Sequence, residues 1–137
     1  MLPLIFRISQ IFFEIFYLIL NVGRCNRTKV YLGGAPKRKF ESKASKILKE
    51  LNVIKGSTID YGCGYGFDAD LNNWDKYDPY YFENKLDKLY DTVVCINVLS
   101  AVSSKIRNEI IESIREILND EGTVYLCVPR NIPITGK

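Results

Sequence analysis

Residues 59–66 have the sequence IDYGCGYG, a short strand pattern that runs directly into three glycines spaced two apart. Glycine adopts left-handed backbone conformations at little cost and lets a ligand approach the main chain closely. In an open α/β sheet, ligands bind outside the carboxyl ends of the strands. We therefore predict a strand at Thr58–Tyr61, followed by a ligand-binding loop built on Gly62, Gly64 and Gly66.

The segments around this loop alternate between helix and strand patterns. Further strands are predicted at Lys76–Asp78, Asp91–Asn97 and Thr123–Val128. Helices are predicted from about Ser42, in a brief segment Phe67–Asn73, and over Ser103–Asn119 with Gly122 as the C-terminal stop. Helices between apolar strands are typical of a mostly parallel α/β sheet. We assign this sheet to one domain, residues 26–137.

The N-terminal segment has a different character. Residues 2–22 are strongly apolar, and their polar positions recur three and four residues apart, which predicts an amphipathic helix within a separate segment 1–25. Three interpretations stay open: a helix that contacts a membrane surface or a partner, a signal-anchor, or an extension outside the functional domain. We expect a cytoplasmic protein, with membrane association only through this N-terminus.

The amino-acid composition excludes several catalytic mechanisms and argues against a metal site. The 137 residues include no histidine, which excludes Ser-His-Asp and Cys-His mechanisms. The four cysteines have no zinc-site spacing, so we predict no metal site and a reducing compartment. Residues 1–59 carry 11 Lys/Arg and 3 Asp/Glu, a charge of 11 − 3 = +8, and the remainder carries 8 − 13 = −5. The basic half fits nucleic acid, an anionic membrane surface or a phosphate-bearing substrate as a partner, and it also fits a solvated basic helix with its entry loop.

A second acidic residue, Asp78, closes the next predicted strand, where its carboxylate can accept hydrogen bonds from ribose hydroxyls. Residues 64–69 match the dinucleotide-binding pattern G-x-G-x-x-A. That pattern requires its acidic residue about twenty positions further on, whereas Asp78 follows Gly64 by fourteen. The spacing therefore disfavours an NAD(P)-binding domain.

An acidic residue followed by Gly-x-Gly-x-Gly, here residues 60–66, resembles the cofactor motif of class I, Rossmann-like S-adenosylmethionine-dependent methyltransferases. Residues 90–99 resemble the fourth strand of these enzymes, and residues 118–126 resemble the turn into their fifth strand. The similarity covers about residues 26–133, and in detail the chain is similar to small methyltransferases of bacteria and phages, some of them associated with DNA phosphorothioation operons. It implies a Rossmann-like fold and S-adenosyl-L-methionine as the cofactor.

The resemblance assigns roles residue by residue. The cofactor-binding residues would be Asp60, Gly62, Cys63, Gly64, Gly66, Asp78 and Asn97. Methyl transfer needs mainly alignment of the acceptor with the methyl group, so the absence of histidine is compatible with it. The candidates for a catalytic polar group are Asn97, at the end of the fourth-strand segment, and Tyr80, in the loop after Asp78.

Two parts of the family fold are missing from the pattern. No third strand is evident between residues 78 and 91, and the antiparallel hairpin that normally follows the fifth strand is absent. The chain is then a fragment, a minimal variant or a decayed copy. The predicted function is methyl transfer to a small-molecule or nucleic-acid acceptor. The alternative is a truncated, non-catalytic binding module tethered to a membrane or partner through residues 2–22.

Overall fold

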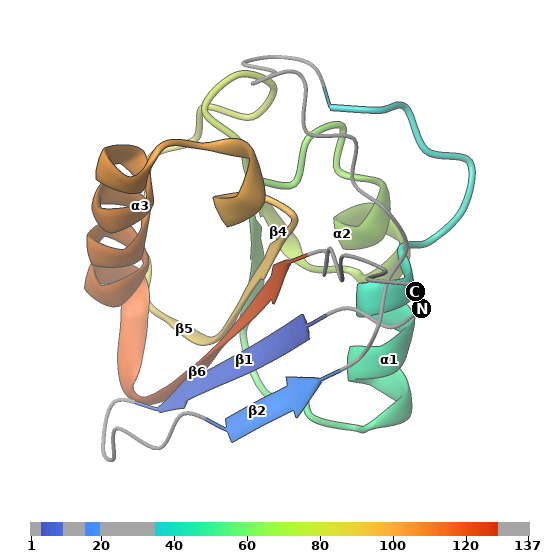
Figure 1. Cartoon of the computed structure of the whole chain (residues 1–137), viewed down its shortest axis with the longest axis horizontal. Coiled ribbons are helices and arrows are strands. Elements are labelled where there is room, and N and C mark those ends of the chain that lie inside the picture. The colour runs from blue at the N-terminus through green and yellow to red at the C-terminus, as the bar shows by residue number, and fades with distance from the viewer. Residues whose placement is uncertain (1–3, 10–15, 20–34, 129–137) are drawn as a thin grey trace, which may run out of the picture.

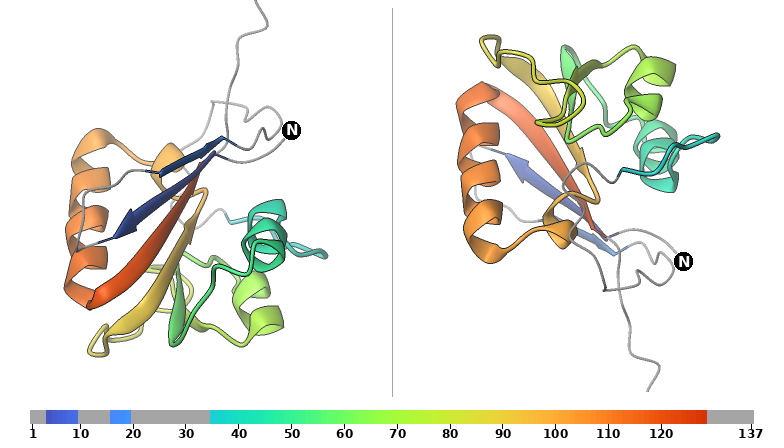
Figure 2. Two further views of the ribbon diagram at one scale, coloured as in Figure 1. Left: turned by 90° about the horizontal axis from the view of Figure 1, so that it is seen from below. Right: turned by 90° about the horizontal axis from the view of Figure 1, so that it is seen from above.

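The computed structural model of the chain describes residues 4–9, 16–19 and 35–128, which form one sheet with helices on both faces (Figures 1 and 2). The strands are β1 (Leu4–Ser9), β2 (Phe16–Ile19), β3 (Thr58–Tyr61), β4 (Asp75–Tyr77), β5 (Tyr90–Ile96) and β6 (Leu118–Val128). The helices are α1 (Lys43–Glu50), α2 (Phe67–Asn72), the single 3₁₀ turn η1 (Leu99–Ala101) and α3 (Ser104–Ile117).

The strand order is β2-β1-β6-β5-β3-β4. The four strands β4, β3, β5 and β6 are all parallel to one another, whereas β1 pairs antiparallel with both β6 and β2. This arrangement confirms the prediction of an α/β fold with a mostly parallel sheet. Because parallel strands end at the same edge, the segments that follow β3, β4 and β5 meet at one side of the molecule.

The two faces of the sheet are covered by different helices, with α3 on one face and α1 and α2 on the other (Figure 2). Successive side chains of a strand point to opposite faces. In β5, Val93 and Cys95 accordingly join the core under α3, while Val94 and Ile96 pack with the fully buried Leu48 of α1. The continuous apolar run of β5 therefore reflects burial on both faces, as predicted.

A buried polar network holds α1 against α2. Ser42 caps α1 by accepting a hydrogen bond from the Ser45 backbone N–H, and its own backbone N–H donates to Asp68 Oδ1 at 2.8 Å. The Asn72 side-chain amide donates to Glu41 Oε1 and to Ser45 Oγ, each at 3.0 Å. Ser42 was predicted as the start of this helix, but its link to α2 depends on a residue 26 positions away in the chain.

The N-terminal segment differs from the prediction. Instead of one helix across residues 2–22, the described parts are the strands β1 and β2, and the rest of the segment lies outside the described residues. The spacing argument considered local periodicity only, whereas β1 pairs with β6, more than a hundred residues away in the chain. None of the helices in the described ranges is long and apolar enough to cross a membrane.

The end of α3 also differs. The helix begins after Ser103, whose Oγ accepts from the Ile106 backbone N–H, in agreement with the prediction. It ends at Ile117, and Leu118 already belongs to β6. The prediction that Gly122 stops the helix was wrong: Gly122 is buried within β6, at an irregularity in the pairing of β6 with β5.

Candidate functional site at the carboxyl edge of the sheet

The loop after β3 is fastened to the end of β4. The backbone N–H groups of Gly62 and Cys63 both donate to the Tyr77 carbonyl, at 2.7 and 3.0 Å. The following N–H, of Gly64, donates to Asp78 Oδ2 at 2.9 Å. These three bonds bring the predicted glycine loop and the predicted acidic residue into direct contact.

The glycines have the backbone conformations that the prediction required, with φ of +80° at Gly62, +58° at Gly64 and +78° at Gly66. The space beside them is occupied by protein. A Cβ on Gly62 would collide with the Val98 side chain, and a Cβ on Gly64 would lie 2.6 Å from Ala35 Cβ. The close approach that glycine permits here is therefore an approach between segments of this chain.

Asp78 organises two loops at once. Besides Gly64, its carboxylate accepts hydrogen bonds from the backbone N–H groups of Tyr80 and Tyr81, at 2.9 and 3.1 Å, both to Oδ1. A carboxylate offers about four acceptor positions, and three are occupied by these amides. The Asp78 residue as a whole remains partly exposed.

Asp60 has the opposite environment. Only 4% of the residue is exposed, beneath the glycine loop. Burial raises the pKa of Asp60 to about 7, with the negative charges of Asp68 and Asp78 acting in the same direction and Arg38 opposing them. The carboxylate of Asp60 is therefore largely covered, and little of it is accessible to a ligand.

The remaining predicted residues lie around this contact. Cys63 is half-buried, and burial together with the nearby Asp60 and Asp78 raises the pKa of its thiol to about 12, so it is protonated at neutral pH. Asn97 follows β5 with φ of +60°, its backbone N–H donates to the Cys127 carbonyl at 2.7 Å, and it is exposed. Its neighbour Val98 packs on Gly62, so Asn97 lies beside the glycine loop.

The predicted Tyr80 belongs to an aromatic cluster that the sequence did not reveal. The rings of Tyr65 and Tyr81 lie 4.4 Å apart, and Tyr80 meets Tyr81 edge-on at 4.9 Å. Lys37 places its Nζ 5.2 Å from the centre of the Tyr65 ring. The one available signal was that tyrosines follow both Asp78 and the second glycine of the loop.

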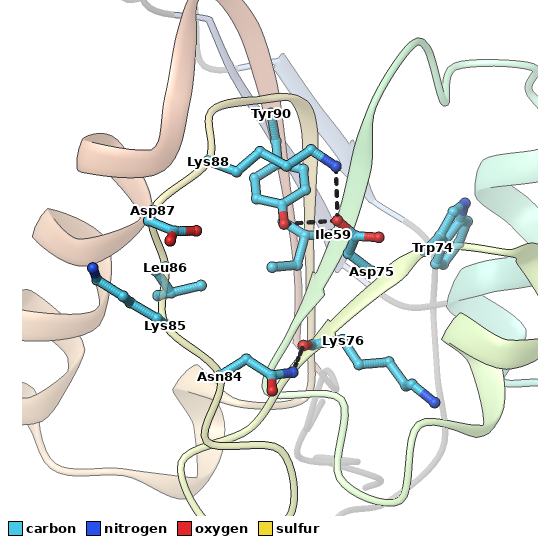
Figure 3. A pocket seen from close by; sticks show the side chains of 10 residues that line it. All are labelled: Ile59, Trp74, Asp75, Lys76, Asn84, Lys85, Leu86, Asp87, Lys88 and Tyr90. Atoms are coloured by element: carbon cyan, nitrogen blue, oxygen red, sulfur yellow. Dashed lines mark hydrogen bonds and ion pairs between the residues drawn. The ribbon is translucent and has the colours of Figure 1, made fainter.

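A separate open depression of about 370 Å³ lies along β4, at the edge of the parallel strands (Figure 3). It contains none of the predicted site residues; it is lined by Ile59, Trp74, Asp75, Lys76, Asn84, Lys85, Leu86, Asp87, Lys88 and Tyr90. Asp75 Oδ2 accepts from Lys88 Nζ at 2.9 Å and from the Tyr90 hydroxyl at 2.8 Å. In the described ranges no strand pairs with this side of β4, in line with the missing third strand.

Comparison with known proteins gives no match to this chain among protein-family models, curated proteins or solved structures. The described residues also contain no group of three or more acidic or cysteine side chains placed to hold a metal ion. The chemistry of the site must therefore be argued from its own geometry.

Proposed function

We propose that the chain binds S-adenosylmethionine at the carboxyl edge of β3, β4 and β5 and transfers its methyl group to an acceptor. The observation that carries the proposal is the Gly64–Asp78 hydrogen bond, which joins an acidic residue to a loop of left-handed glycines at the ends of two adjacent parallel strands. The antiparallel β1–β2 pair lies beside β6, but it precedes the parallel strands in the chain, whereas the hairpin of the resembled family normally follows the fifth strand.

Two groups at this edge of the sheet suit the cofactor and its acceptor. The partly exposed Asp78 carboxylate can offer an acceptor to a ribose hydroxyl. Asn97 presents an exposed amide at the end of β5, which can orient the acceptor. When bound, the cofactor supplies a methyl group on a positively charged sulfur. The chain would then provide position and alignment, which methyl transfer chiefly needs.

The second candidate is a non-catalytic binding module, which the close packing inside the site favours. Three amides already occupy Asp78, and protein side chains fill the space beside Gly62 and Gly64. Such a loop keeps its shape without a ligand. A module of this kind would bind its partner without releasing a methylated product.

The test is isothermal titration of the full chain with S-adenosylmethionine, followed by incubation with radiolabelled cofactor and candidate acceptors. We expect Asp78→Ala to weaken cofactor binding about tenfold or more, because a hydrogen bond to a charged group contributes about 1.5–3 kcal/mol. The control is Asp120→Asn, at an exposed position in β6, which should bind as the unmodified chain does.

Circular dichroism establishes that each protein is folded before the titration. Folded, unmodified protein that gives no heat with the cofactor would refute the proposal. Cofactor binding without transfer to any acceptor would instead support the non-catalytic module.

A further inference from the structure

Exposed aromatic rings lie together beside the glycine loop. Tyr65 is 41% exposed and Tyr80 is 68% exposed, and both contact the half-buried Tyr81 between them. The hydroxyl-bearing rings come from two loops that Asp78 holds together, since it accepts from the backbone N–H groups of Gly64 and Tyr80. The cluster is thus a fixed aromatic surface, set by backbone hydrogen bonds.

Positively charged side chains lie along one side of this surface. The segment that carries Lys37, Arg38 and Lys39 runs from the glycine loop to the start of α1 (Figure 1), and all three side chains are exposed. Its first lysine stands over the Tyr65 ring. Residues 37–49 contain six Lys/Arg and one acidic residue, Glu41, a local charge of 6 − 1 = +5.

Carboxylates near the cluster cancel part of this charge, and the buried Asp60 lies close enough to Arg38 to interact with its charge. Glu41 is paired with Lys49 at 2.8 Å, and Asp70 is paired with Lys76. Asp78 is directed at three backbone amides, so its charge is partly compensated. Glu83 is the nearest exposed acid that follows the tyrosine loop in the chain. The surface on the side of residues 37–39 is therefore basic.

We infer that the surface formed by Tyr65, Tyr80, Tyr81 and residues 37–39 binds single-stranded nucleic acid. Bases of any sequence stack on exposed aromatic rings, and a basic groove follows the phosphates. An anionic membrane would also attract the lysines, and Phe40 is 79% exposed on the same segment. The three mutually packed tyrosines favour stacking on bases, because their hydroxyl groups suit a wet interface better than insertion into lipid.

In one respect the inference depends on the proposed function: a strand held on this surface lies beside Gly64 and Asp78, so it would be the methyl acceptor. Binding itself can be measured without the cofactor. The probe is a fluorescently labelled oligonucleotide of about 15 nucleotides of mixed sequence, made once as DNA and once as RNA. Anisotropy is measured with the full chain across a range of salt concentrations.

We expect saturable binding with a Kd below about 100 µM at low salt. Tyr80→Ala should weaken it about fivefold or more at every salt concentration, since one stacked base contributes about 1–3 kcal/mol. Tyr80→Phe keeps the ring and should stay within about twofold. Lys37→Gln should reduce the slope of log Kd against log salt by about 0.7, the loss of one phosphate contact. Lys105→Gln, an exposed lysine on α3 at the opposite face of the sheet, is the matched control and should leave the slope unchanged.

The inference is overturned if folded protein binds neither oligonucleotide, or if Tyr80→Ala and Lys37→Gln bind as the unmodified chain does. Sedimentation with vesicles of phosphatidylcholine and phosphatidylserine that is lost in Tyr80→Ala and Lys37→Gln, at a salt concentration where no oligonucleotide binds, would assign the surface to a membrane and also overturn the inference. Oligonucleotide binding without heat from S-adenosylmethionine would refute the proposed function alone. Cofactor heat without oligonucleotide binding would refute this inference alone.

Discussion

Replacing Asp60 with asparagine should change how the stability of the protein depends on pH. The pKa of Asp60 is raised from its ordinary value of 3.8 to about 7, first by burial and then by the charges of Asp68 and Asp78. The folded chain therefore keeps this proton at pH values where the unfolded chain has already lost it. Because the folded state binds more protons, the free energy of unfolding falls as pH rises from about 4 to about 7.

The size of this effect follows from the shift. A difference of about 3 pKa units, at 1.36 kcal/mol per unit, corresponds to at most about 4 kcal/mol of stability lost between pH 4 and pH 8. An asparagine side chain has no such proton to lose, so Asp60→Asn removes this part of the pH dependence. The free energy of unfolding of the variant, relative to that of the unmodified chain, should therefore rise steadily from pH 4 to pH 8. A constant difference in stability caused by the amide does not alter this trend.

Urea unfolding monitored by circular dichroism at several pH values between 4 and 8 measures the difference. Asp120→Asn, at an exposed position, is the control and should run parallel to the unmodified chain. If the stability difference between Asp60→Asn and the unmodified chain varies by less than about 0.5 kcal/mol over this range, the raised pKa is refuted. If the variant instead becomes less stable relative to the unmodified chain as pH rises, the direction of the pKa shift is wrong.

Two further substitutions test the supports of the site. Asn72→Ala should reduce the free energy of unfolding by about 1–3 kcal/mol, because it removes the hydrogen bonds that the Asn72 amide donates to Glu41 and Ser45 between α1 and α2. The exposed Asn108→Ala is the control and should change the free energy of unfolding by less than about 0.5 kcal/mol in the same urea titration. Gly64→Ala should lower the free energy of unfolding by about 1 kcal/mol or more, because the Gly64 backbone is left-handed and an added Cβ would meet Ala35. Asn73→Gly, at a left-handed position at the C-terminus of α2, is the control and should change the free energy of unfolding by less than about 1 kcal/mol.

The sequence was sufficient to predict those elements whose pattern depends on neighbouring residues. The predicted helix Ser103–Asn119 agrees with α3 within two residues at each end, and the predicted strand Asp91–Asn97 agrees with β5 within one. The glycine spacing predicted the left-handed loop after β3. Each of these features depends on residues that are close together in the chain, so periodicity and capping describe them well.

The sequence failed where distant segments decide the outcome. Residues 4–9 have an apolar pattern that fits a helix or a strand, and only the free side of β6 makes them a strand. Tyr65 and Tyr81 are sixteen positions apart in the chain. Their rings meet because Asp78 accepts hydrogen bonds from both loops. No short-range pattern contains that information, so the aromatic cluster could not be predicted.

The structure also separates two carboxylates that the sequence treated as a pair. Asp60 and Asp78 both lie at the glycine loop, and both were predicted to bind the cofactor. Asp60 is enclosed beneath the loop and holds its proton up to about pH 7, so its effect on a ligand must pass through the backbone above it. Asp78 is partly exposed, so of the two it alone can offer an acceptor to solvent or to a ribose. Substitution of Asp78 should therefore weaken cofactor binding directly, whereas substitution of Asp60 should act first on stability and its pH dependence.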